Sequence, residues 1–213
     1  MVSFQKPSSG CAAVLICCDA CICASCHPGA GLFAFYYPNL DVLNGGTPTP
    51  AARLSPDWRP EGAGIVARRL QDTAWSVYCS KAYAGQHGHP KTAEALDGHL
   101  VVGMEGPMGN LPIALWLARM TPNSIVAVRS NSLTNLVSAL KSGLGVGMLP
   151  CFLGDVEPDL QRCLPPIAEL DSQTWLVLRE DLKHSPHVRA FADFISAYVQ
   201  RLRSRFAGTA PVV

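Results

Sequence analysis

The sequence predicts an α/β fold for most of the chain, and three observations support this prediction. Short runs rich in β-branched and aromatic residues, typical of strands, recur after residue 75. Segments with helical periodicity or helix-capping residues lie between them. The 213 residues are 48% hydrophobic and 15% charged, which is typical of a globular chain with a sizeable core and not of a disordered one. Strands that alternate with helices are typical of α/β domains.

The elements from residue 75 to residue 128 are predicted from apolar runs and the residues that interrupt them. Thr92 is a suitable N-cap for a short helix, and Thr121-Pro122 should end a longer one. In order, we expect a strand at 75–79, a polar turn around 83–88, a short helix at 93–96, a strand at 100–104, a loop from Glu105 to Gly109, a helix at 111–120 and a strand at 125–128.

The next stretch, VRSNSLTNLVSALKSGLGVGMLPCF, predicts a strand, a helix and a second strand. Its leucines and valine at 133, 136, 137 and 140 recur at the spacing of an amphipathic helix. Asn131 or Ser130 would be the N-cap, and Gly143 would follow the last turn. Two strands joined by a helix form a βαβ unit, so the strands at 125–128 and 146–149 should be parallel.

The polar run Ser130-Asn131-Ser132 falls where that strand ends and the helix begins. Open α/β sheets bind ligands outside the carboxyl ends of their strands, and a helix N-terminus there offers unpaired N–H groups and a positive dipole end. The run therefore suits a carboxylate or another acceptor. Helix capping alone would also explain the same three residues.

The C-terminal part should contain two short strands and a final helix. The strands are expected at 160–163 and 175–178, and Ser185-Pro186 supplies an N-cap and a first-turn proline. The predicted buried face of the helix consists of Val188, Phe191, Ile195, Tyr198 and Leu202.

The first 32 residues are predicted to be an irregular leader that is rich in cysteine. Six of the nine cysteines lie between Cys11 and Cys26. The pairs CDAC and CASC have zinc-ligand spacing, but a zinc ribbon needs a long loop between its pairs and here one residue separates them. We therefore expect no metal, no cofactor and no disulfide framework, and the leader could be disordered.

Charge and hydropathy restrict the partners. The formal net charge is +1, without the basic face that DNA-binding domains usually carry. A short apolar run at 12–16 loosely resembles a signal peptide, but Asp19 interrupts it. No stretch reaches the ~18 apolar residues of a membrane span.

The runs GLGVGMLP (143–150), WLVLREDL (175–182) and PHVRAF (186–191) are the most specific parts of a pattern from Arg68 to Val199. That pattern resembles the effector-binding domain of LysR-type transcriptional regulators. The resemblance implies a type 2 periplasmic-binding-protein-like fold, with two α/β subdomains facing each other across a ligand cleft. The second subdomain would cover 75–170, and an incomplete first subdomain would combine 33–74 with 171–208. The chain would cross between them near 69–74 and 170–175.

With that fold, the expected effector site comprises Ser130, Asn131 and Ser132, with Glu105 and Gly109 on the same rim. The resemblance also implies a homodimer in the cytoplasm. The family's N-terminal winged helix-turn-helix is not visible in the sequence, so we expect a truncated regulator that does not bind DNA directly. The alternative is an exported solute-binding protein of the same fold.

An enzyme is the third class. Cys151, just after a strand, is the best candidate nucleophile, but no histidine with an acidic orienting residue is evident. Phosphate-binding loops, dinucleotide fingerprints and the HExxH zinc motif are also absent from the sequence. We therefore predict that the chain is not an enzyme.

Overall fold

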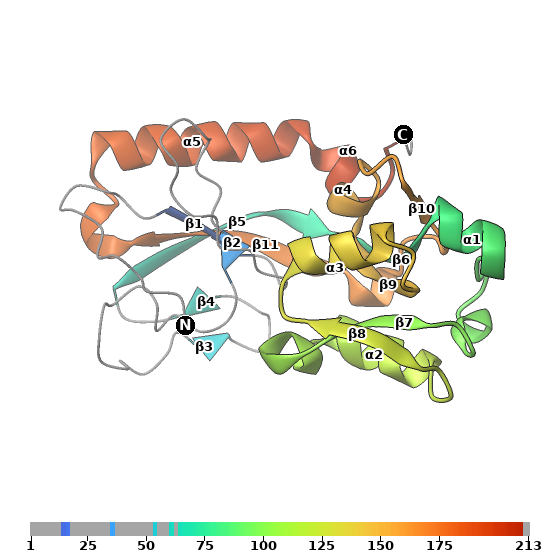
Figure 1. The fold of residues 1–213 in the computed structure, drawn as a ribbon. Coiled ribbons are helices and arrows are strands. Elements are labelled where there is room, and N and C mark those ends of the chain that lie inside the picture. Colours follow the sequence, from blue (N-terminus) through green and yellow to red (C-terminus); the bar gives the residue numbers. More distant parts are fainter. Residues whose placement is uncertain (1–13, 18–34, 37–52, 55–59, 62–63, 211–213) are drawn as a thin grey trace.

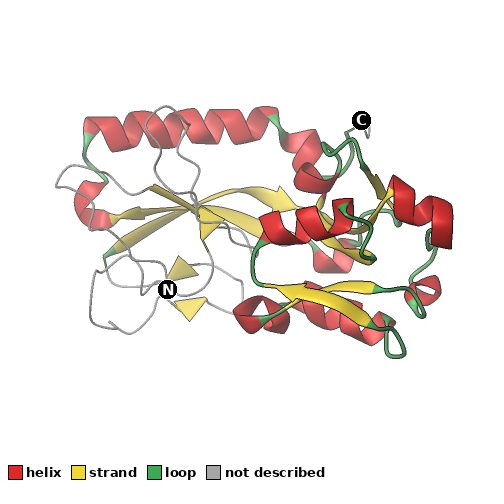
Figure 2. Ribbon diagram, viewed as in Figure 1, coloured by secondary structure: helices red, strands yellow, loops and turns green. Residues whose placement is uncertain are grey.

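The computed structural model describes residues 14–17, 35–36, 53–54, 60–61 and 64–210 (Figure 1). The two C-x2-C pairs and the remainder of the leader, apart from one strand, lie outside the described residues. Lys6 and Asp19, which flank the signal-like apolar run at 12–16, also lie outside the described residues. The described part forms a five-stranded sheet, a four-stranded sheet and a separate two-stranded pair, with helices packed around the two larger sheets (Figure 2).

The larger sheet has five strands in the order β10-β6-β9-β7-β8. Its strands are β6 (Trp75–Ser80), β7 (Val101–Met104), β8 (Val126–Ser130), β9 (Val146–Pro150) and β10 (Leu160–Arg162). β8 and β9 both run parallel to β7, whereas β6 is antiparallel to β9 and β10 is antiparallel to β6. The prediction of parallel strands around the helix is therefore confirmed, with β7 lying between them.

Two helices cover opposite faces of this sheet. α2 (Pro112–Met120) connects β7 to β8, and α3 (Leu133–Lys141) connects β8 back to β9 (Figure 1). The predicted apolar stripe of α3 is buried in the main core of the molecule. That core also contains Trp75, Tyr78 and Met148 from the strands. This packing fixes the strand ends and helix starts that form the candidate site.

The smaller sheet has the order β2-β1-β11-β5. Its strands are β1 (Val14–Cys17), β2 (Phe35–Tyr36), β5 (Ile65–Thr73) and β11 (Ser172–Arg179), and a separate pair is formed by β3 (Arg53–Leu54) and β4 (Pro60–Glu61). β11 is antiparallel to both β1 and β5. The strand predicted at 175–178 is thus longer than expected, and β1 lies within the leader expected to be irregular.

The final helix packs along this smaller sheet. α5 (Pro186–Arg201) begins after Ser185 as predicted and is followed by the short α6 (Arg203–Phe206). Val188 and Ile195 are buried against Leu176 of β11. Tyr198, expected on the buried face, is instead 38% exposed and stacks on Phe194, which is 56% exposed. Val199, one residue later, takes the buried position. The buried stripe of α5 is therefore displaced by one residue at this point of the helix.

The prediction of a polar turn around residues 83–88 is wrong. Residues Lys81–His87 form the helix α1, in which the Ser80 hydroxyl accepts a hydrogen bond of 3.0 Å from the Tyr83 N–H. Tyr83 is buried, and its hydroxyl lies 3.1 Å from His99 Nδ1. A serine N-cap and one buried aromatic side chain are therefore enough to fold a segment whose other side chains are mostly polar.

The two sheets meet at Ala74, between β5 and β6. Its N–H donates to the carbonyl of Phe206 at 2.8 Å, and its own carbonyl accepts from the N–H of Cys151 at 2.9 Å. One residue therefore ties α6 to the start of α4 (Cys151–Gly154) in the larger unit. The chain passes between the sheets here and again near Asp171, close to the two crossings expected from the sequence.

Candidate functional site

The carboxyl ends of β7 and β8 lie side by side. Met104 pairs with Ser130 in the parallel register, and the next N–H, that of Glu105, donates to the Ser130 carbonyl at 3.2 Å. The chain then turns through a 3₁₀ helix, Gly106–Asn110, in which the Gly109 N–H donates to the Glu105 carbonyl at 3.2 Å. Glu105 is exposed and Gly109 is half-buried.

The start of α3 is built differently from the prediction. Ser132, and not Asn131 or Ser130, is the N-cap residue, and its carbonyl accepts the first helical bond from the Leu136 N–H at 3.0 Å. The Ser130 hydroxyl accepts a 3.1 Å hydrogen bond from the Ser132 N–H. Ser130 therefore shapes the turn before the helix. No side chain caps the first-turn N–H groups of α3.

The uncapped start of α3 can bind an acceptor. The first N–H groups of an α-helix have no intrahelical partner, and the helix dipole makes this end positive. Ser132 is half-buried and Asn131 is exposed beside them. The Asn131 Cβ lies 4.0 Å from the position that a Cβ on Gly106 would occupy, which brings the β7 loop next to the β8 loop.

All five expected site residues thus gather at one edge of the larger sheet. We call Glu105, Gly109, Ser130, Asn131 and Ser132 the polar rim. The rim combines two hydroxyls, one amide, one carboxylate and the N-terminus of a nine-residue helix. This set can donate several hydrogen bonds to a small polar molecule at the strand ends.

A small hollow of 140 Å³ lies beside the residues that come just after the loop 105–110. On one side it is lined by Leu111 and Ile113 at the start of α2, and on the other by the segment Glu169–Gln173 that leads into β11. The start of α2 also has no side-chain cap. Sequence reasoning missed this hollow, because residue 113 and residues 169–173 come together only through the crossing between the sheets.

The sulfur of Cys151 is a poor nucleophile. Cys151 is fully buried at the start of α4, and burial raises the pKa of its thiol. A raised pKa keeps the thiol protonated, whereas a reactive cysteine needs the thiolate. Among the residues that the structure describes, no group of three or more histidine, cysteine, aspartate or glutamate side chains could hold a metal ion.

Comparison with known proteins identifies the fold and its family. The family model described as "LysR substrate binding domain" matches residues 53–200, well over half of the chain. The chain belongs to the LysR substrate-binding domain family. The LysR family match covers β5, the whole larger sheet and nearly all of α5, and it contains every residue of the polar rim.

The relatives of this LysR domain are transcriptional regulators. The HTH-type transcriptional regulator CrgA of Neisseria meningitidis serogroup C (strain 8013) is 29% identical over 153 residues, which are 70% of this chain and 50% of the relative. The chain thus spans about half the length of that curated relative.

Solved structures confirm the type 2 periplasmic-binding-protein-like fold class. The regulatory domain of CrgA from N. meningitidis has a TM-score of 0.51 and 27% identity, covering 64% of this chain and 69% of the other. A second CrgA structure has a TM-score of 0.51 and 28% identity, covering 65% and 49%. Within the part of the chain that is described, no helix is long and apolar enough to span a membrane.

Proposed function

We propose that this LysR substrate-binding domain senses a small effector that binds at the polar rim. The observation that supports this most is the convergence of three backbone ends: the carboxyl ends of β7 and β8 and the uncapped N-terminus of α3. An effector with a carboxylate or a similar acceptor would receive hydrogen bonds from the first-turn N–H groups and from the Ser132 hydroxyl.

Binding at this place can change the arrangement of the two sheets. The rim belongs to the larger sheet, and the 140 Å³ hollow lies between residues 111–113, which follow the rim loop in the chain, and the segment 169–173, which leads into the smaller sheet. A ligand that contacts both sides stabilises the arrangement in which both contacts form. The proposed output is therefore a shift between relative positions of the two sheets, which the full-length regulator would transmit to DNA.

We also propose that this is a cytoplasmic, non-enzymatic domain that pairs with a second copy of itself and contacts DNA only as part of the full-length regulator. The net charge of +1 gives little electrostatic drive toward phosphates. Phe194 and Tyr198, which are 56% and 38% exposed and stack on each other, give α5 an apolar contact surface for a second copy. Sedimentation equilibrium should give twice the monomer mass, and a monomer at all concentrations would contradict pairing.

Replacing Ser130 and Ser132 together with alanine should weaken effector binding by ~1–3 kcal/mol, because two hydroxyls that donate to or orient the ligand are removed. A thermal-shift screen first identifies a binding compound, and calorimetry then compares its affinity for the two proteins. Urea denaturation of the same samples measures stability.

A matched control lies at the other end of the same helix. The hydroxyls of Ser138 and Ser142 donate to the carbonyls of Thr134 and Ser138 at 3.0 and 2.9 Å, away from the rim. The double substitution of this pair with alanine should leave affinity unchanged. If the Ser130/Ser132 variant instead loses ~0.5–2 kcal/mol of stability with unchanged affinity, the two serines only shape the helix start and the site assignment is wrong.

A further inference from the structure

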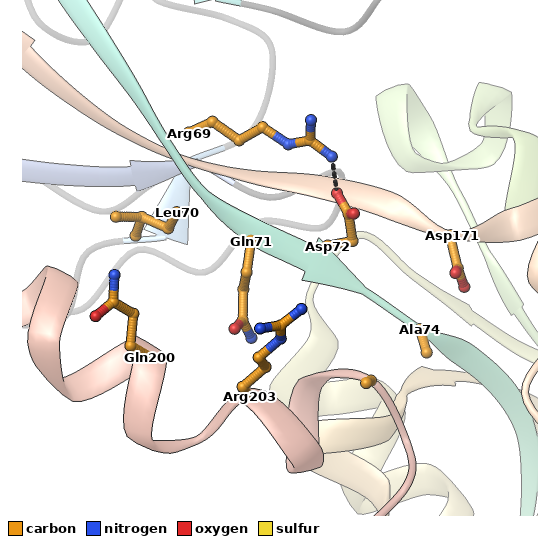
Figure 3. A pocket seen from close by; sticks show the side chains of 9 residues that line it. Arg69, Leu70, Gln71, Asp72, Ala74, Asp171, Gln200 and Arg203 are labelled. Carbon is orange, nitrogen blue, oxygen red and sulfur yellow. Dashed lines mark hydrogen bonds and ion pairs between the residues drawn. The ribbon is translucent and has the colours of Figure 1, made fainter.

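A second, larger hollow lies at the joint between the two sheets. It has a volume of 710 Å³ and is bounded by the end of β5, the residue before β11, and the junction of α5 with α6 (Figure 3). Six of its nine lining residues come from the two crossing segments. No residue of the polar rim lines it. The hollow is therefore a separate feature from the proposed effector site.

One of the two acids that line this hollow has no ion pair with a described residue. Asp72 on β5 is paired with Arg69, whereas Asp171, from the other crossing segment, has no ion pair or side-chain hydrogen bond with any described residue. Burial, and then the nearby Asp72 carboxylate, raise the pKa of Asp171. Figure 3 shows the Asp72 carboxylate directed at Arg69, so the exposed Asp171 carboxylate is the acid of this lining that is left to contact a cationic group.

Another part of the hollow has unused hydrogen-bond donors. The Nε2 atom of Gln71 is buried and has no hydrogen-bond partner among the described residues, so a ligand that accepts a hydrogen bond from it would satisfy a donor that is otherwise unpaired. The Arg203 side chain extends from α6 toward Gln71, and its guanidinium forms no ion pair with the acids that the structure describes (Figure 3). An amide and a guanidinium together suit a carboxylate, which accepts several hydrogen bonds at once.

The backbone between these groups is part of the joint itself. Leu70 has no partner in the register between β5 and β11, so the ladder has a bulge beside Gln71. Bulges commonly redirect side chains next to functional sites. Ala74, whose hydrogen bonds join α6 to the larger unit, also lines the hollow. A molecule bound here would contact both crossing segments and the end of the chain's last helices.

We propose that this hollow binds a small zwitterion of the amino-acid type, with its ammonium group at Asp171 and its carboxylate at Arg203 and Gln71. Bound there, the zwitterion holds the two crossing segments and α6 together. It would therefore stabilise one arrangement of the two sheets from a place other than the polar rim.

The test is calorimetric titration of the whole chain at low salt with each of the common L-amino acids, β-alanine and γ-aminobutyrate. We expect at least one of them to bind. The matching amine without its carboxylate, and the matching N-acetylated acid, should each bind at least tenfold more weakly, because each keeps only one of the two charges.

Variants locate the site and separate the two proposals. Asp171→Asn and Arg203→Gln should each weaken zwitterion binding at least tenfold, while Arg205→Gln, at another exposed position of the same helix, should leave binding unchanged. The Ser130/Ser132 double alanine variant should also bind normally. The proposal is overturned if no zwitterion binds, if binding survives both hollow variants, or if it disappears with the rim variant. Circular dichroism of each variant confirms that the fold is retained.

Discussion

Replacing Asp155 with alanine is expected to lower the free energy of unfolding by about 3–5 kcal/mol. Asp155 is 3% exposed and forms an ion pair with Arg162, which is 15% exposed. The Tyr78 hydroxyl donates to the same carboxylate at 2.7 Å, and Arg162 also donates to the Gly208 carbonyl at 2.9 Å. The substitution leaves a buried guanidinium and a buried phenol without their acceptor. Urea denaturation followed by circular dichroism measures the loss.

Two further variants separate burial of the charge from the simple loss of an ion pair. The exposed pair of Arg68 and Asp193, with side chains 55% and 75% exposed, should lose less than ~1 kcal/mol in Asp193→Ala. Combining Asp155→Leu with Arg162→Met should recover much of the stability, because no unpaired charge remains. A loss below ~1 kcal/mol for Asp155→Ala would show that this network does not hold the C-terminal segment in place.

Replacing Gly145 with alanine is expected to lower stability by about 2–6 kcal/mol. The φ angle of Gly145 is +147°, a conformation that costs an L-residue ~1–3 kcal/mol. An added Cβ would also collide with the carbonyl oxygen of Leu100, which accepts the Val146 N–H at 2.8 Å, and such overpacking costs a further ~1–3 kcal/mol. Thermal and urea unfolding of the purified variant measure the combined effect.

Gly143 provides the matched control two residues earlier. Its φ angle is +78°, but the nearest atom to an added Cβ is the Ser80 hydroxyl oxygen at 3.6 Å, which is ordinary contact. Gly143→Asn should therefore lose at most ~1 kcal/mol, since asparagine tolerates the left-handed conformation. Equal losses at the two positions would mean that the close approach to Leu100 is not what requires glycine in the GLGVGMLP run.

The larger sheet could be predicted because its signals are local. β6, β7 and β9 are short, fully buried runs, and α3 has a complete apolar stripe between a polar turn and Gly143. β5 was not predicted as a strand, because its sequence, IVARRLQDT, has charged residues at its centre. It becomes a strand through pairing with β11 over its length, and that pairing joins segments about a hundred residues apart.

The same contrast between local signals and contacts of distant segments applies to the candidate site. The polar rim could be predicted because strand ends and helix starts can be located from periodicity, and parallel strands bring their carboxyl ends to one edge. The cap itself was assigned to the wrong residue, since Ser130 and Ser132 are both good N-caps and differ only in backbone geometry. Neither hollow could be predicted, because residues such as Gln71, Asp171 and Arg203 meet only in the folded chain.

Amide hydrogen exchange of the chain, with and without a compound found by the thermal-shift screen, tests the assignment of the effector site most directly. Binding at the polar rim should slow exchange in residues 105–110 and in the first turn of α3, because the ligand occupies N–H groups there and restricts the two loops. Residues around Ser138 and Ser142 should change little. Protection confined to other parts of the chain, such as residues 71–74 and 200–207, would contradict the assignment of the effector site to the polar rim.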